Sequence, residues 1–348
     1  MHLTKLLLRD FRCHGELLLE LSPGCNLFLG DNARGKTSIL EAAHFLATSS
    51  SFRALRSSDM IRHGAESSQV AGKVGESTLR VVFSKEQRQS FIGREKCADR
   101  DHWRKLLQTV PFTTADNQIA KAGAGVRRRF LDSLIAAQFA PHAPALVDFK
   151  KLLRSRNLLL KKGVDRDSRG LFDTITAQFA LVSGQIARTR GQWTRKLSPL
   201  ARLAYRKLSG GGEDLQLSYH DTGEGSLEEK LVRLAGEERR FRATLAGAQL
   251  DDLLLTLDGQ PVTQFASEGQ QRSVALALRL AQVELLKGLH GSWPVILLDD
   301  VMGELDEGRR NRLIELGHQG AQVLLTATEI NWDHSRKNTG KVFDLGKK

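Results

Sequence analysis

The chain has 348 residues, of which 41% are hydrophobic and 26% charged, and its formal net charge is +12. This composition is typical of a soluble globular protein, and no apolar run approaches the roughly 20 residues that a membrane-spanning helix needs. Charge interrupts the run from Met1 to Arg9 too early for a signal peptide, and three scattered cysteines lack metal-ligand spacing, so a cytoplasmic protein without a membrane partner is expected.

The first third of the chain alternates between strand patterns and one helix. Short apolar or alternating runs bounded by Gly, Pro and Ser turns predict strands. These predicted strands cover Leu3–Leu8, Leu17–Leu21, Cys25–Leu29, 68–74 and 77–83. The last two form a predicted hairpin, and residues 84–110 have too weak a pattern for a prediction.

A phosphate-binding loop lies between the third strand and the first helix. It reads Gly30-Asp31-Asn32-Ala33-Arg34-Gly35-Lys36-Thr37-Ser38 and fits G-x-x-x-x-G-K-[ST] at every fixed position. Its backbone N–H groups are expected to face phosphate oxygens, Lys36 to reach the β/γ-phosphates, and the Thr37 hydroxyl to hold Mg²⁺. The alternative is a chance match in a glycine-containing turn, against which the strand and helix flanks argue. ATP with Mg²⁺ is therefore the expected cofactor.

From about residue 126 the hydrophobic period becomes helical. Four apolar stripes predict an all-helical insert of roughly a hundred residues that ends at Gly210-Gly211-Gly212. Residues 121–210 contain 19 Lys or Arg against 5 Asp or Glu, so this insert carries the basic charge of the chain. Concentrated basic charge predicts a polyanion-binding surface, most reasonably for nucleic acid. The alternative is a solvated helical arm without a dedicated ligand.

After the insert, a strand at Leu215–Tyr219, a charged helix to about Arg242 and a hairpin with an Asp258-Gly259 turn are predicted. A long apolar helix follows over Val274–Leu286. The buried strand Pro294–Leu298 then ends in two acids, Asp299 and Asp300. This strand has the form of a Walker B motif, in which Asp299 would hold Mg²⁺ and Asp300 would orient or deprotonate the attacking water. Alone the pattern is weak, because Asp is also common in turns at strand ends.

Two further motifs support this interpretation. The stretch Ala266-Ser267-Glu268-Gly269-Gln270, directly before the long helix, resembles the signature motif of ABC-type ATPases, and Gly303-Glu304-Leu305-Asp306 resembles their D-loop. A serine hydroxyl, a glycine and a helix N-terminus can grip a γ-phosphate. The residues assigned to nucleotide here are Ser267, Gly269, Gln270 and Asp306.

The spacing of these motifs predicts the architecture. Ser267 lies 231 positions after Lys36, with the helical insert between them, as in SMC-like proteins with a split head. The expected fold is α/β, an ABC-type ATPase head (mixed sheet with P-loop) with an inserted basic all-helical arm domain. The head is assigned to residues 1–112 plus 242–348 and the arm to residues 113–241.

Over essentially its full length the chain resembles the RecF family of bacterial recombination mediators. The resemblance rests on the loop and its continuation, the signature and Walker B stretches, and the blocks Leu6–Arg12, Ser51-Phe52-Arg53, Arg128–Asp132 and Leu153–Asn157. Three departures stand out: Gly247–Leu253 lacks the usual Pro-His-basic trio, Glu268 replaces a common glycine, and no histidine follows the last strand at Thr326-Ala327-Thr328. The Q-loop glutamine could be Gln69 or Gln118.

The resemblance implies a nucleoid-associated, ATP-dependent DNA-binding protein of recombinational repair. Such proteins bind duplex DNA near single-strand gaps, work with RecR and RecO, and help load the RecA recombinase. It also implies an ATP-dependent homodimer with weak ATPase activity, in which the catalytic set is Asp300, Lys36 and Ser267, the serine acting in trans. The candidate DNA contacts, chosen by charge alone, are Arg127, Arg128, Arg129, Lys150, Lys151, Arg154, Lys161 and Lys162.

Two other functions fit parts of the sequence. The alternative is an SMC-like ABC ATPase with a non-DNA regulatory role, against which the basic insert argues. A nuclease of the overcoming-lysogenization-defect type would need a metal-dependent domain after the head, and too few residues follow Walker B for one.

Overall fold

The computed structural model describes residues 2–54, 56–221, 226–328 and 340–346. It contains two compact units: Met1–Asp116 with Arg279–Lys348, and Asn117–Leu278. The sequence-based division placed residues 242–278 with the head. In the structure they group with the second unit, because β10 (Asp252–Leu257) pairs along its whole length with β9 (Leu215–His220).

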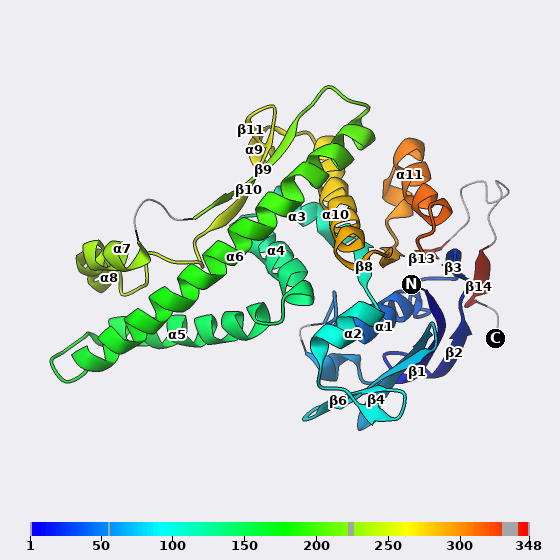
Figure 1. Cartoon of the computed structure of the whole chain (residues 1–348), viewed down its shortest axis with the longest axis horizontal. Coiled ribbons are helices and arrows are strands. Elements are labelled where there is room, and N and C mark those ends of the chain that lie inside the picture. Colours follow the sequence, from blue (N-terminus) through cyan, green and yellow to red (C-terminus); the bar gives the residue numbers. More distant parts are fainter. Residues whose placement is uncertain (1, 55, 222–225, 329–339, 347–348) are drawn as a thin grey trace. The chain divides into compact units, whose positions relative to one another are not determined.

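A five-stranded parallel sheet forms one half of the first unit (Figure 1). Its order is β14-β3-β13-β12-β8, and every pairing in it is parallel. The strands are β3 (Cys25–Leu29), β8 (Thr109–Thr113), β12 (Val295–Asp299), β13 (Val323–Ala327) and β14 (Lys341–Asp344). Continuous apolar runs in β12 and β13 suit strands that are covered on both faces. The predicted strands at Cys25–Leu29 and Pro294–Leu298 are thereby confirmed.

An antiparallel sheet of six strands forms the other half of this unit, in the order β2-β1-β4-β5-β6-β7. The strands are β1 (Leu3–Phe11), β2 (His14–Glu20), β4 (Ser67–Val74), β5 (Ser77–Ser84), β6 (Arg88–Ile92) and β7 (Glu95–Lys96). The predicted hairpin is confirmed as β4–β5, whose register runs from Ser67↔Ser84 to Val74↔Ser77.

Helix α1 (Lys36–Thr48) packs against strands of both sheets. Its apolar residues Ile39, Leu40, Phe45 and Leu46 are fully buried in a core that includes side chains from each sheet. Two more helices belong to this unit, α2 (Arg100–Leu106) and α11 (Glu307–His318). The central position of α1 fixes the phosphate-binding loop, which immediately precedes it.

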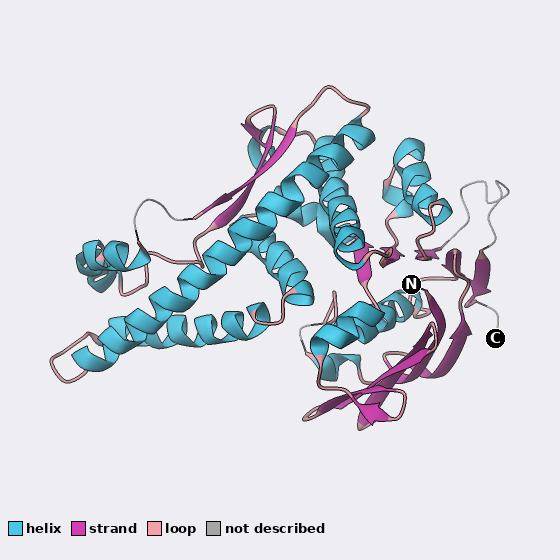
Figure 2. Ribbon diagram, viewed as in Figure 1, coloured by secondary structure: helices cyan, strands magenta, loops and turns pink. Residues whose placement is uncertain are grey.

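The second unit is mainly helical (Figure 2). Its long helices are α4 (Ala124–Gln138), α5 (His142–Lys162) and α6 (Arg169–Ser209), and its short ones are α3 (Asn117–Lys121), α7 (Leu227–Arg233), α8 (Ala235–Phe241) and α9 (Val262–Phe265). The all-helical stretch expected to end at Gly210-Gly211-Gly212 is present as α3 to α6, and the strand and hairpin expected after it form a three-stranded sheet, β11-β10-β9, that packs on α6. The Asp258-Gly259 turn joins β10 to β11 (Gln260–Pro261) with φ values of 49° and 80°, as a type I′ hairpin requires.

The predicted apolar helix is longer than its pattern suggested. Helix α10 runs from Glu268 to His290, so its N-terminus coincides with the signature stretch. Among the described residues, no helix combines the length and the apolar character needed to cross a bilayer.

Candidate nucleotide-binding site

The phosphate-binding loop is shaped by residues in the left-handed backbone region. Gly30, Ala33 and Gly35 have φ values of 145°, 67° and 86°, and α1 begins at the next residue, Lys36. A Cβ on Gly35 would lie 2.4 Å from His14 Nε2 and 2.5 Å from Cys13 Sγ. Both the conformation and the space therefore require glycine at this position.

Gly35→Ala is expected to destabilise the fold by more than backbone strain alone. Strain in the left-handed region costs about 1–2 kcal/mol for a residue with a Cβ, and the clash with His14 and Cys13 adds to it. Gly64→Ala is the matched control, because Gly64 has the same φ of 86° and nothing within 4 Å of its Cβ position. Urea unfolding of both variants measures the difference; equal losses of unfolding free energy would contradict the clash.

Lys36 is only 8% exposed and folds back over the loop. Its Nζ donates hydrogen bonds to the carbonyl oxygens of Gly30 at 2.5 Å and Asp31 at 2.9 Å. The ammonium group is therefore held at the loop by neutral acceptors, which a phosphate could replace with a charge-assisted contact.

The loop and the Walker B strand meet at one edge of the parallel sheet. Strands β3 and β12 both pair with β13, so their carboxyl ends lie at the same edge. Thr37 Oγ1 donates to Asp299 Oδ1 at 2.7 Å across 262 residues of sequence. Thr326, at the register position of Asp299, donates to the same oxygen at 3.1 Å. The structure thus brings together the two residues that the sequence assigned to Mg²⁺.

Asp300 differs from Asp299 in exposure and backbone. It is exposed, has a φ of 54°, and donates its N–H to Thr326 Oγ1 at 2.9 Å. The left-handed conformation of Asp300 ends β12. Asp299 is therefore partly buried at the end of the strand, whereas Asp300 is exposed. This difference is compatible with the two roles that the sequence predicts, a metal ligand and a water-orienting residue.

Burial raises the pKa of Asp299 above its usual value of 3.8, and the charge of Asp300 adds to that shift. Hydrogen bonds from Thr37 and Thr326 and the charge of Arg53 lower the pKa and oppose the shift. The carboxylate is therefore costly to keep charged without a cation beside it.

Asp299→Asn is expected to raise the melting temperature of the nucleotide-free protein at neutral pH and to abolish Mg²⁺-dependent nucleotide binding. A carboxyl with a raised folded-state pKa favours folding at low pH, and this contribution is lost as pH rises from its unfolded value through the raised pKa. Asparagine has no such loss. Thermal unfolding between about pH 4 and 8 should show wild type falling relative to the variant; parallel curves would contradict the shift.

The available oxygens fit Mg²⁺ held together with a nucleotide. Magnesium is usually bound by one or two carboxylates plus phosphates and water, and Asp299 with Thr37 provides such a partial set. Among the described residues, no group of three or more His, Cys, Asp or Glu could hold a metal without such help. The ion would then neutralise charge on the phosphates.

An ion pair that sequence reasoning did not assign joins the β1–β2 turn to α1. Arg12 binds the fully buried Glu41 of α1 through Nε at 2.8 Å and Nη2 at 2.7 Å, and Ser51 also donates to this carboxylate. Arg53, which follows in the same block, is exposed and close enough for its charge to lower the pKa of Asp299. Arg12 and Arg53 both lie in sequence blocks that resemble the family, but that resemblance assigned no role to either residue.

The signature stretch forms a helix cap. The Ser267 N–H donates to Gln270 Oε1 at 2.6 Å, and the Gln270 N–H donates to Ser267 Oγ at 3.3 Å, which is a reciprocal capping box. Ser267 and Gly269 are exposed at the N-terminus of α10. Glu268 places a negative charge there, but Lys121 Nζ binds it at 2.7 Å and lowers its pKa. This pairing keeps the helix end suitable for an anion.

Other nucleotide candidates have structural partners. Asp306 is the N-cap of α11: its Oδ1 accepts from the Arg309 N–H at 2.8 Å and its Oδ2 pairs with the Arg309 guanidinium. For the Q-loop, Gln69 lies within β4 between β1 and β5, whereas Gln118 is exposed on α3. A role of Asp306 in nucleotide binding would have to be compatible with its capping bonds.

The candidate DNA contacts require one correction. Arg127 is 6% exposed, binds both carboxylate oxygens of Asp252 at 2.8 and 2.7 Å, and donates to the Ala122 carbonyl. It is a structural residue and is removed from the DNA set. Arg128 is half-buried and donates to the Asp251 carbonyl at 2.5 Å. The exposed candidates are Arg129, Lys150, Lys151, Arg154, Lys161 and Lys162.

Fold and site together define an ABC-type ATPase head of the SMC-like branch. Residues 2–344 match the family described as RecF/RecN/SMC N terminal domain. The DNA replication and repair protein RecF of Symbiobacterium thermophilum is 35% identical over 348 residues, covering 95% of this chain and 92% of the relative. That of Listeria welshimeri is 32% identical over 367 residues, covering 100% and 98%. The chain belongs to the RecF family.

Solved structures agree with this assignment. The recombination mediator protein RecF with ATP, described as part of the RecFOR pathway, matches with a TM-score of 0.85 and 26% identity, covering 98% of this chain and 95% of the other. The Smc head domain from Pyrococcus furiosus, with 17% identity and a TM-score of 0.51, shares the fold over 94% and 90% of the chains. The predicted fold class is thus confirmed.

Proposed function

We propose that this protein is an ATP-dependent DNA-binding recombination mediator that acts as a nucleotide-controlled dimer. The observation that carries the proposal is the bond between Thr37 of the phosphate-binding loop and Asp299 of Walker B, which forms one half of an ATP site. The signature at the start of α10 would provide the other half, since Ser267 is exposed and caps the N-terminus of this helix. Names of the relatives support a role in DNA replication and repair.

The proposed site is completed by a second copy of the chain. Each subunit binds ATP with its own loop, and Ser267 and Gly269 of the other subunit grip the γ-phosphate through the helix N-terminus. ATP therefore shifts the population toward the closed dimer, in proportion to its differential affinity for that state. Loss of the γ-phosphate removes this contact and releases the dimer.

Hydrolysis is proposed to be slow and to serve as the switch. Asp300 orients or deprotonates the attacking water, because its exposed carboxylate follows the metal-binding Asp299 directly. Lys36 stabilises charge on the β/γ-phosphates. The DNA itself is not chemically altered.

The ATP-bound dimer is proposed to bind duplex DNA at single-strand gaps, to act with RecR and RecO, and to help load the recombinase. Exposed cations of the second unit support contacts with the phosphate backbone, which give binding that depends on salt and little on sequence. The remaining members of the set are Arg128, Arg129, Lys150, Lys151, Arg154, Lys161 and Lys162.

Filter binding to gapped DNA across a salt series tests this function. With ATP present, the logarithm of the binding constant should fall steeply with the logarithm of salt concentration. A flat response, or equal binding with and without ATP, would contradict an ATP-controlled interaction with the DNA backbone.

A further inference from the structure

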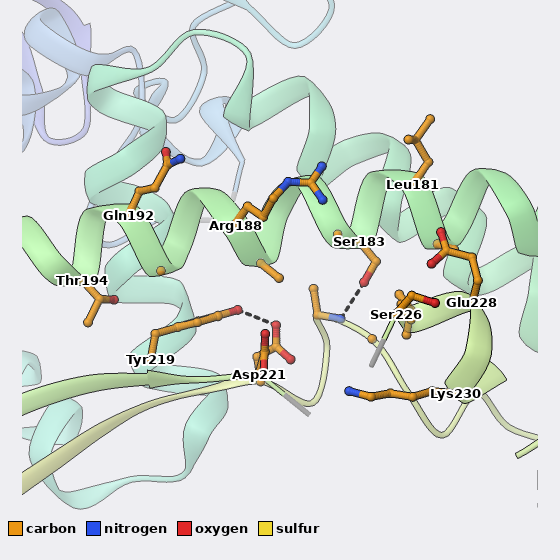
Figure 3. A pocket seen from close by; sticks show the side chains of 18 of the residues that line it. Leu181, Ser183, Arg188, Gln192, Thr194, Tyr219, Asp221, Ser226, Glu228 and Lys230 are labelled. Atoms are coloured by element: carbon orange, nitrogen blue, oxygen red, sulfur yellow. Dashed lines mark hydrogen bonds between the residues drawn. The ribbon is translucent and has the colours of Figure 1, made fainter. Parts of the chain in front are cut away.

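A cleft of about 770 Å³ lies along α6 in the second unit (Figure 3). Its walls come from one side of α6, from β9 and α7, and from the loop at Gly247–Asp251. None of the residues assigned to nucleotide or to DNA above lines it.

The α6 wall contains a short repeat at a spacing of seven residues. Gly184-Gln185-Ile186-Ala187-Arg188 is followed by Gly191-Gln192-Trp193-Thr194-Arg195, so Gly-Gln-x-x-Arg occurs twice. Seven residues correspond to almost two helical turns and about 10.5 Å of rise, which places both copies on one side of the helix. Figure 3 shows Arg188 and Gln192 projecting from the same side of α6.

Each arginine lies over the glycine one turn before it. A Cβ on Gly184 would be 3.3 Å from Arg188 Nη1, and one on Gly191 would be 3.8 Å from Arg195 Nη1. Both arginines are exposed, and neither makes an ion pair within the described parts of the chain. By contrast, Arg190, between them, is 3% exposed and binds Asp132. Arg190 thus has a structural role within the fold, whereas the other two guanidinium groups can contact a ligand.

The cleft also contains an unsatisfied hydroxyl. Thr194 lines it and is 3% exposed, and Thr194 Oγ1 has no hydrogen-bond partner among the described residues. A buried hydroxyl without a partner costs free energy, which a ligand oxygen would relieve. Two guanidinium groups without an ion pair among the described residues and an unpaired hydroxyl together suit an anionic backbone.

Resting on the proposed DNA-binding function, we infer that the paired arginines of α6, Arg188 and Arg195, bind the phosphate backbone of DNA. Their Cα atoms are about 10.5 Å apart along α6, and two long arginine side chains at that separation can reach different phosphates of one backbone. The opposite wall carries two carboxylates, Asp221 and Glu228, and one buried ammonium group, Lys230, so α6 is the more positive wall of the cleft. The contacts are independent of base sequence.

The test is DNA binding by the full chain with ATP across a salt series, comparing wild type with Arg188→Gln/Arg195→Gln. Loss of two phosphate contacts should lower the magnitude of the salt slope by about 2 and weaken binding about 30-fold at 0.15 M salt. Arg166→Gln, which removes one exposed cation outside the cleft, is the control for charge loss and should have much less than half the effect of the double variant. Glu228→Gln should strengthen binding, because it removes a negative charge that faces the phosphates.

The outcomes separate this inference from the function on which it rests. If wild type does not bind DNA in a salt-dependent way, the proposed function fails. If wild type binds and the double variant matches it or Arg166→Gln, or if Glu228→Gln leaves affinity unchanged, only the α6 site is overturned. Unchanged melting temperatures should show that the variants fold, since neither arginine has an ion-pair partner among the described residues.

Discussion

Replacement of Lys36 by alanine should weaken ATP binding by about 30-fold or more, because losing a charge-assisted contact in a partly buried site costs about 2–5 kcal/mol. The ammonium group donates to the carbonyl oxygens of Gly30 and Asp31, and is thus placed where the loop is expected to meet phosphates. Isothermal titration calorimetry with ATP and Mg²⁺ measures the effect directly.

Two controls make the Lys36 result specific. Lys85→Ala removes an equal charge from the exposed β5–β6 turn and should leave ATP affinity unchanged. The melting temperature of Lys36→Ala should stay within a few degrees of wild type, because only neutral partners are lost. ATP binding by Lys36→Ala with wild-type affinity would show that Gly30–Ser38 is not the phosphate site.

Ser267→Arg should retain ATP binding by single subunits but abolish ATP-dependent dimerisation. Ser267 is exposed at the N-terminus of α10, where the γ-phosphate of the other subunit is proposed to dock. A bulky cation there obstructs that approach, whereas the loop at Gly30–Ser38 is unchanged. Calorimetry of ATP binding and light scattering with ATP give the two measurements.

The cap at Ser267 needs its own control, because the serine also stabilises the helix. Ser267→Ala loses the cap, at a cost of about 1 kcal/mol, without adding bulk. It should dimerise more weakly than wild type but better than Ser267→Arg. Normal dimerisation of Ser267→Arg would refute the assigned role of the signature.

The nucleotide site could be predicted because its signals are local. A strand, a glycine-bounded loop and a helix follow each other at Cys25–Thr48, and the predicted bounds of the strand agree with the structure. Only the sheet order, however, places Thr37 beside Asp299, because β13 separates β3 from β12. Strand β8 was missed since Pro111 interrupts its pattern; the proline is tolerated because β8 lies at the edge of the sheet.

The arm was harder to predict, because local charge does not distinguish a structural cation from a free one. Arg127, Arg156 and Arg190 are buried and bind carboxylates 125, 82 and 58 positions away in the sequence. Such partners can be identified only in the folded chain. Once these buried arginines are set aside as structural, Arg188 and Arg195 remain as exposed cations on α6.

The most direct test of the proposed switch is the mass of the protein in solution with and without ATP. Light scattering on Asp300→Asn, which should bind ATP but hydrolyse it slowly, is expected to give the 38.6 kDa monomer without nucleotide and twice that mass with ATP and Mg²⁺. Asparagine suits this position because it tolerates the positive φ of Asp300. A monomer under both conditions would contradict an ATP site shared between two subunits and the ATP-dependent dimer that this site requires.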